Sequence, residues 1–318
     1  MSESTEDVVG RTQIRVNGAS VAVTSAEVDD RLVIVQGDWL RIASVFDEDL
    51  VEGDIVSNPA RFMNGLITCG IEADLFTFRQ KIPDTLPHYP DYRHEFDSFA
   101  VIPITTYPDW LQLAKSDVRS AINKSVKRGL ITKEVECDDR FIAGVVQIYN
   151  ETPIRQGRPF WHFNKDFEAV KEMTRTYLER SIFVGAYLGE QLVGFIKMVT
   201  VANICCTLHV ISMMKSSDKK PTNALIAKAV EICASRGLSH LVYGNFIYKD
   251  PKSSLTEFKQ RNGFREMLIP RYYIPLTHKG RIALKTGLHH GVSARLPIGV
   301  WRALSKGRAI LWKAKAGV

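Results

Sequence analysis

The densest group of side chains that can do chemistry lies in the stretch YNETPIRQGRPFWHFNKD, residues 149–166. Its prolines indicate a loop, and its two arginines can each hold a carboxylate or a phosphate in a bidentate way. Trp161 offers a face for a sugar or another ring, and His162 titrates near neutral pH. A rigid loop whose aromatic side chains fill a domain interface is the alternative. The substrate-binding candidates are Glu151, Arg155, Gln156, Arg158, Trp161 and Lys165, and His162 is a catalytic candidate.

A second titratable group, His209, lies in the apolar stretch ICCTLHVISMM, residues 204–214. Strand alternation would place Cys205, Thr207, His209 and Ile211 on one face. His209 is then a candidate general base. A buried, hydrogen-bonded core histidine is the alternative.

The turn KKPTNA, residues 219–224, precedes a helical pattern that ends at Gly237. Lys219 and Lys220 bring positive charge, Pro221 suits a first-turn position, and Thr222 can cap the helix. Backbone N–H groups at such a helix start bind anions. A well-capped core helix with solvated lysines is the alternative.

The elements that must position these residues follow from hydrophobic periodicity. The pattern predicts a helical stretch over residues 107–129, with Asp109 or Ser116 as possible N-caps, a helix over 138–152 and another over 164–180 that is capped by Asn164. A hairpin turning at Gly189 and Glu190 follows, and then strand, helix, strand, helix and strand. A strand–helix–strand unit implies a parallel pair in an otherwise antiparallel sheet. Residues 12–46 read as short strands.

The length of the chain and the distribution of its charges indicate separate parts. Its 318 residues favour two domains. Of the 42 basic residues, nine lie from Lys279 onward with no acidic residue, which leaves 33 basic against 35 acidic residues before it. The net charge of +7 therefore belongs to the tail. The tail also carries Trp301 and Trp312, so it predicts an amphipathic segment for an anionic membrane surface. Docking on its own domain and partial disorder are the alternatives.

Five cysteines, irregularly spaced and without a CxxC pair, indicate reduced packing residues and no metal site. No apolar run is long enough to span a membrane, and the N-terminus does not resemble a secretory signal. We therefore expect a cytoplasmic protein, with the tail as a candidate contact to the inner membrane surface.

Four features in this order resemble the GNAT acyltransferase superfamily: FVGAYLGEQLVGFIKM, HVISMMKSSDKKPTNALIAKAVEICASRG, LVYGNF and FKQRNGF. SDVRSAINKSVKRGL is similar to the basic helix of the Fem-type aminoacyltransferase branch, whose proteins carry two GNAT-like domains. The resemblance implies a mixed α/β (α+β) fold with a mostly antiparallel sheet flanked by helices. The expected domains are a β-rich N-terminal domain (1–115), a GNAT-like acyltransferase domain (116–278) and a basic tail (279–318).

The resemblance further implies acyl-CoA, such as acetyl-CoA, as co-substrate, and no metal. It places the 149–166 loop beside the acceptor. The family's glycines at the phosphate turn are replaced here, and its usual tyrosine acid is replaced by Lys259, so Tyr248 is the candidate substitute. The implied donor-binding residues are Ile211, Met213, Lys219, Lys220, Thr222, Asn223, Ala224 and Asn245.

Three functions fit these patterns. The first is N-acyl transfer to an amine of a sugar, glycan precursor or cell-envelope metabolite. The second is a Fem-type transferase that uses aminoacyl-tRNA, and the third is a non-catalytic binding protein with the same fold. The residues Arg119, Lys124, Lys127 and Arg128 form either a solvated face or a contact to a phosphorylated acceptor or tRNA.

Overall fold

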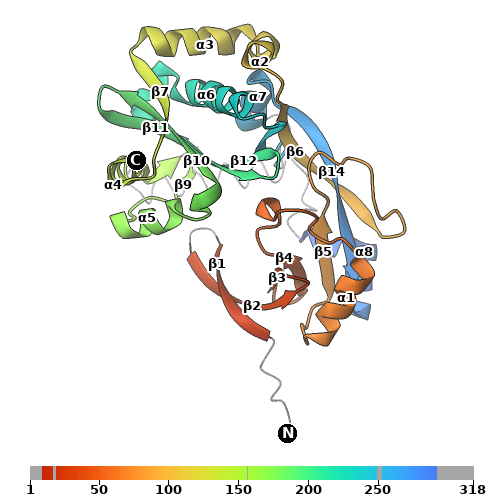
Figure 1. Cartoon of the computed structure of the whole chain (residues 1–318). Helices are drawn as coiled ribbons and strands as arrows, with labels where there is room; N and C mark the ends of the chain where they lie inside the picture. Colours follow the sequence, from red (N-terminus) through yellow and green to blue (C-terminus); the bar gives the residue numbers. More distant parts are fainter. Residues whose placement is uncertain (1–8, 17–18, 156, 249–252, 292–318) are drawn as a thin grey trace. The chain divides into compact units, whose positions relative to one another are not determined.

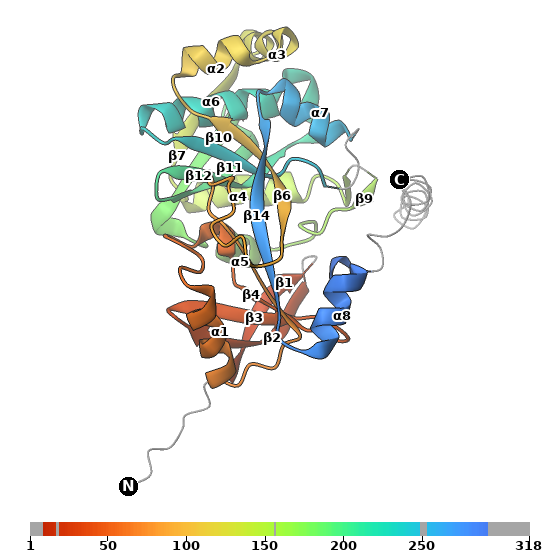
Figure 2. The same ribbon diagram turned by 90° about the vertical axis from the view of Figure 1, so that its right-hand side faces the viewer.

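The computed structural model describes residues 9–16, 19–155, 157–248 and 253–291, and these residues form two compact units. The first unit contains the described residues up to 97 and from 268 onward, and the second contains residues 98–267 (Figures 1 and 2). No helix in the described ranges has both the length and the apolar character that crossing a membrane requires.

The first unit is a sheet with the strand order β1-β2-β3-β4-β5-β14. Only β4 and β5 pair in parallel, and α1 belongs to the connection between them. Phe62 of α1 stacks on Phe76 of β5 at 5.0 Å, which places the core between this helix and the sheet. The elements are β1 (Val9–Val16), β2 (Ala19–Val28), β3 (Arg31–Gln36), β4 (Ile42–Val45), η1 (Glu48–Leu50), α1 (Pro59–Thr68), β5 (Leu75–Arg79), β14 (Arg265–Pro275), α8 (His278–Thr286) and η4 (Leu288–His290).

The helix α8 lies close against the start of β5. A Cβ on Gly280 would come within 1.9 Å of the Asp74 carbonyl oxygen, so only glycine permits this approach. Ala283 and Leu284 pack with Leu75 in one buried cluster. The first residues of the predicted tail thus belong to a folded unit, whereas Trp301 and Trp312 lie outside the described residues.

The second unit is a sheet with the strand order β6-β13-β12-β11-β10-β7. Its strands are β6 (His94–Pro103, from residue 98), β7 (Leu130–Val135), β10 (Ser181–Leu188), β11 (Gln191–Val201), β12 (Ile204–Ser212) and β13 (His240–Asn245). Its helices and small hairpin are α2 (Tyr107–Leu113), α3 (Ser116–Lys127), α4 (Asp139–Tyr149), β8 (Ile154–Arg155), β9 (Arg158–Pro159), α5 (Phe167–Thr174), η2 (Leu178–Arg180), η3 (Met214–Lys219), α6 (Pro221–Ser235) and α7 (Ser254–Arg261).

The two faces of this sheet are covered by different helices. On one face a Cβ on Gly194 would lie 3.2 Å from Leu225 of α6, and on the other Phe195 meets Phe141 of α4 at 5.8 Å. Figure 1 shows α2, α3 and α6 on the first side and α4 and α5 on the second. The predicted mixed, mostly antiparallel sheet flanked by helices is confirmed, as are its single parallel pair β12–β13 and the turn at Gly189.

Two local predictions are wrong, and one strand was not predicted. The helical stretch expected over residues 107–129 is divided into α2 and α3, and their N-caps are Thr106 and Lys115 instead of Asp109 or Ser116. Arg119 donates to backbone carbonyls at the end of α2, including that of Ala114, and so closes α2. The cap of α5 is Asp166, whose carboxylate accepts from the Ala169 N–H, and Asn164 precedes it in a left-handed conformation. The edge strand β7 was not expected, because its mostly polar sequence carries little apolar alternation.

Candidate functional site

The strands β12 and β13 pair over only three residue pairs, from Ile204 with His240 to Cys206 with Val242. Immediately beyond, β12 is bulged, so that Thr207 and Leu208 lie opposite the single residue Met198. β13 is also irregular at Gly244, which has φ +53°. Beyond these points neither strand pairs with the other, and the backbone groups along this edge are left for another partner.

The bulge corrects the predicted face of His209. Directly paired residues point to the same side of a sheet, and His209 pairs with Lys197, whereas Thr207 pairs with Met198. Adjacent residues 197 and 198 point to opposite sides, so His209 and Thr207 do as well. The prediction that both share a face is wrong because an extra residue interrupts the alternation.

The N-terminus of α6 has no side-chain cap. Lys220 adopts a left-handed conformation with φ +58°, and Pro221 opens the helix. Thr222 does not cap, because its hydroxyl lies 3.0 Å from that of Ser212 instead. The first-turn N–H groups of Thr222 and Asn223 have no acceptor within the helix, which is the arrangement that attracts anions.

Glu151 and Arg155 hold the end of β12 in place. The Glu151 carboxylate accepts from the N–H groups of Met214 and Lys215 at 2.7 and 3.0 Å. The Arg155 guanidinium donates to the carbonyls of Ser212 and Ile148 at 2.8 and 3.0 Å, and to Glu151 at 3.2 Å. Both side chains are mostly buried, so this pair supports the site and does not reach outward to a substrate.

His162 lies in an aromatic stack. Its ring is 4.2 Å from that of Tyr149 and 3.6 Å from that of Trp161, and it meets His209 edge-on at 5.4 Å. His162 is 2 % exposed, while Trp161 is 47 % exposed and presents an open face. The structure thus brings the two predicted histidines together beneath the tryptophan.

Burial, together with the Lys197 cation, lowers the pKa of His209 to about 4. The imidazole is therefore neutral at pH 7, and a base with so low a pKa is poorly matched to neutral conditions. His209 fits the role of a neutral packing partner better than that of a general base.

This pKa predicts an acid-dependent loss of stability. Because the folded pKa is below the unfolded value of 6.5, the unfolded chain binds the extra proton first as the pH falls, and stability is lost between about pH 6.5 and 4. Relative to His209→Gln, we expect the wild type to lose up to roughly 3 kcal/mol of unfolding free energy over this range. Urea denaturation at several pH values measures it, with the exposed His88→Gln as control. Parallel curves for wild type and His209→Gln would contradict the prediction.

Lys259 of α7 is a buried cation at the end of β13. It is 0 % exposed, and its ammonium donates to the carbonyls of Tyr243 and Asn245 at 2.7 and 2.5 Å. Burial lowers its pKa to about 8. The Tyr248 ring lies 4.9 Å from this ammonium. The sequence marks Lys259 only as the residue that stands four before Gly263, at the place of the family's tyrosine, and does not reveal its burial.

The remaining predicted residues are more scattered. Met213 is buried and donates its N–H to Val193, and Lys219 pairs with Asp218, which also binds Arg128. Arg158, Lys220, Asn245 and Tyr248 are exposed, Ile211, Asn223 and Lys165 are partly buried, and Ala224 is buried. Gln156 lies outside the described residues.

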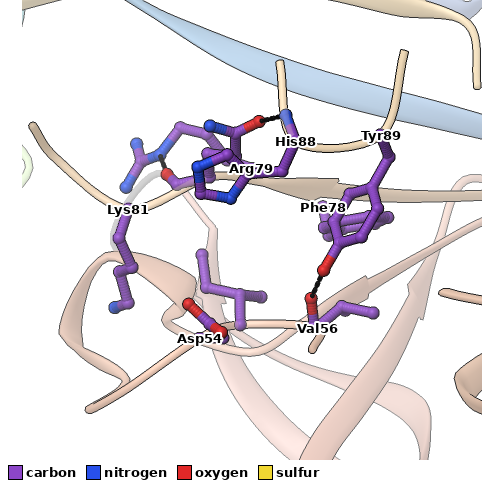
Figure 3. A pocket seen from close by; sticks show the side chains of 9 residues that line it. Asp54, Val56, Phe78, Arg79, Lys81, His88 and Tyr89 are labelled. Carbon is purple, nitrogen blue, oxygen red and sulfur yellow. Dashed lines mark hydrogen bonds between the residues drawn. The ribbon is translucent and has the colours of Figure 1, made fainter. Parts of the chain in front are cut away.

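A small polar recess in the first unit is not large enough for a substrate. It is lined by residues that include Arg79, Lys81, His88 and Tyr89, and Figure 3 shows the Tyr89 hydroxyl donating to the Val56 carbonyl. Its volume is about 10 Å³, which is the space of a single water.

No protein-family model and no curated protein matches the chain. Solved structures do. The C-terminal domain of a putative lysylphosphatidylglycerol synthetase from Agrobacterium fabrum has a TM-score of 0.53 at 12 % identity, covering 84 % of this chain and 89 % of that one. L-PGS from Bacillus licheniformis has a TM-score of 0.53 at 14 % identity, with coverages of 83 % and 88 %. FemX has a TM-score of 0.49 at 11 % identity, with coverages of 82 % and 87 %. At these identities the likeness concerns the fold alone, and the predicted GNAT-like fold is confirmed.

Proposed function

We propose that the second unit is an N-acyltransferase, which moves an acyl group from acyl-CoA to an amine of a sugar, glycan precursor or cell-envelope metabolite. One observation carries the proposal: β12 and β13 stop pairing beside the uncapped N-terminus of α6. An extended acyl carrier can hydrogen-bond along the freed edge of β12, in the way that a peptide adds to a sheet edge. The phosphates of the carrier then meet the first-turn N–H groups of Thr222 and Asn223, with the Lys219 cation nearby.

The transfer itself needs a hydrogen-bond donor and a proton source. The amine attacks the thioester carbonyl, and backbone N–H groups of the β12 edge stabilise the negative charge that develops on its oxygen. The carbon–sulfur bond then breaks, the thiolate takes a proton from Lys259, and the nitrogen that has formed the amide gives up one proton, which restores the Lys259 ammonium. Lys259, with a pKa of about 8, replaces the tyrosine of related enzymes as the acid, because its pKa is close to that of a thiol.

The acceptor is proposed to meet the exposed side chains of the loop between α4 and α5. Arg155 and Glu151 are committed to the end of β12, so the exposed Arg158 and Trp161, with the partly buried Lys165, are the residues proposed to contact it. His162 stacks against one face of the Trp161 ring and supports its position.

An aminoacyl-tRNA donor is the second candidate, and two observations favour it. The Glu151 carboxylate takes two N–H groups at the start of η3, and Pro221 offers no N–H, so fewer donors remain for a pyrophosphate than in a glycine-rich turn. Two structures of this fold are also named for lysylphosphatidylglycerol synthesis or as L-PGS. Among the basic residues of α3 and its C-cap, Arg119 and Arg128 are engaged within the protein, which leaves Lys124 and Lys127 for a polyanion.

Calorimetric titration with acetyl-CoA tests the first candidate. We expect saturable binding, at least about tenfold weaker in Thr222→Asp, because a carboxylate there occupies the N–H groups and repels phosphate while favouring the helix. Gln112→Glu adds the same charge at an exposed position of α2 and should bind like the wild type.

Absence of heat and of thermal shift at millimolar acetyl-CoA would contradict the acyl-CoA proposal. A gel-shift with charged tRNA at two salt concentrations then tests the second candidate, since a specific complex weakens steeply with salt. Failure of both donors would favour a binding protein that has this fold without its chemistry.

A further inference from the structure

A cluster of three metal-ligating side chains lies in the first unit. Glu95 comes from the start of β6, and His289 and His290 come from η4, about 194 residues later in the chain. The Nε2 atom of His289 is 3.1 Å from one carboxylate oxygen of Glu95, and that of His290 is 2.9 Å from the other. One ligand atom from each of the three residues lies within 4.8 Å of the others.

The surrounding protein fixes the direction of these side chains. The His289 side chain is 0 % exposed, and the edge of its ring meets that of Tyr273 at a centroid distance of 4.7 Å. The two imidazole rings lie 3.9 Å apart. The turn η4 follows α8 directly in the chain, and Gly280 allows α8 to lie close to the Asp74 carbonyl. The cluster is therefore built on packed elements and does not sit on a loose surface loop.

The hydrogen-bond partners of the two His289 ring nitrogens favour a cation between these groups. His289 Nδ1 lies 3.4 Å from the Ala283 carbonyl, which is an acceptor, so Nδ1 carries the hydrogen. In a neutral ring Nε2 then presents a lone pair to a carboxylate oxygen at 3.1 Å, and two acceptors repel one another. Either an added proton or a metal ion relieves this contact. A backbone carbonyl on the second ring nitrogen is the usual arrangement behind metal-ligating histidines.

The ligand set also selects the class of metal. Two imidazole nitrogens and one carboxylate oxygen form the three-residue set of open zinc sites, with a water as fourth ligand. In a tetrahedral site with zinc–ligand distances near 2.0–2.1 Å, neighbouring ligand atoms are roughly 3.3 Å apart. The present distances of 3.1 and 2.9 Å require small movements. Nitrogen ligands disfavour magnesium and calcium. Arg93, 3.3 Å from Glu95, is the charged group that competes with the metal.

We propose that Glu95, His289 and His290 bind one Zn²⁺ or a similar divalent transition metal, which joins η4 to β6 within the first unit. His290 is 44 % and Glu95 30 % exposed at the side chain, so the ion and its fourth ligand can exchange with solvent.

The test uses the full chain with no histidine tag, stripped with a chelator, dialysed and titrated with zinc sulfate. We expect one zinc per chain by elemental analysis and a rise in melting temperature on addition of the metal. Glu95→Gln and His290→Ala should bind at least about tenfold more weakly, because each removes a ligand from a partly exposed position. His278→Ala removes an exposed histidine at the start of α8 and should bind like the wild type.

Cobalt substitution gives an independent readout that does not depend on stability. A visible absorption band that appears with Co²⁺ in the wild type and in His278→Ala, and is lost in His290→Ala, supports the site. The proposal is overturned if the wild type retains no zinc. It is also overturned if Glu95→Gln and His290→Ala bind as tightly as the wild type, since the ion would then lie elsewhere.

Discussion

Replacing Lys259 with methionine is expected to lower the rate of acyl transfer by at least about a hundredfold while leaving the stability of the chain unchanged or higher. The ammonium is fully buried, and the fall of its pKa from 10.5 to about 8 means that folding disfavours the charged form by roughly 3 kcal/mol at pH 7. Methionine removes this penalty. It also leaves the Tyr243 and Asn245 carbonyls without their donor, which costs about 1–3 kcal/mol in return.

Lys197 provides a matched control for this experiment. It is likewise 0 % exposed, burial likewise lowers its pKa to about 8, and its ammonium donates to Thr176 on the face that carries His209. Lys197→Met should therefore keep transfer within a few-fold of the wild type. Equal losses of transfer rate in both variants would show that the rate depends on buried lysine charge in general and not on the charge of Lys259.

The same pKa gives a pH dependence with a definite sign. Transfer that needs the Lys259 ammonium falls as the pH rises through about 8. Stability moves in the opposite direction, because the folded chain releases its proton at about 8 while the unfolded chain keeps it to 10.5. From pH 7 to 10 the transfer rate of the wild type should therefore fall while its free energy of unfolding rises. Lys259→Met should lose the fall in rate and keep only the part of the stability rise that comes from Lys197, whose pKa is also about 8.

Glu151→Ala is expected to lower the free energy of unfolding by about 3 kcal/mol or more. The change leaves the Met214 and Lys215 N–H groups without their acceptor, and leaves the Arg155 guanidinium buried without its counter-charge. The end of β12 and the start of η3 both depend on this carboxylate, so the loss is structural as well as electrostatic.

Urea denaturation measures the effect, and Glu151→Gln is the matched control. Its amide oxygen can still accept one N–H while the charge is lost, so an intermediate loss of about 1–2 kcal/mol is expected. Adding Arg155→Ala to Glu151→Ala should cost much less than the two changes separately, because the buried charge is then removed with its partner. A loss below about 1 kcal/mol in Glu151→Ala would show that water satisfies these groups.

The sequence predicted those parts of the second unit that depend on neighbouring residues. The turn at Gly189 follows from a glycine between two apolar strands, and the parallel pair follows from a helix that returns the chain to the same end of the sheet. Both are determined within a few dozen residues, so periodicity and turn chemistry are enough to find them.

The rest depends on contacts between distant residues. The bulge at Leu208 leaves no mark in the alternation of apolar residues, yet it turns His209 to the other face. Arg119 divides a continuous helical pattern by binding the carbonyls of the preceding turns. The sequence alone suggests that Lys259 is a surface lysine, because its contact with β13 is visible only in the fold. Glu95 lies far in the sequence from His289 and His290. No local pattern reveals these pairs.

The division of the chain into two units has a consequence during synthesis on the ribosome. The strand β5 is buried along its whole length and pairs on one side with β4 and on the other with residues 271–275 of β14. The second unit, residues 98–267, is translated between these two partners. Until β14 emerges, one edge of an apolar strand lacks its neighbour, and such edges promote aggregation. A nascent chain halted when residue 267 has just left the ribosome should therefore hold a folded second unit and an unfinished first one, and chaperones that bind exposed strands should be retained at that stage.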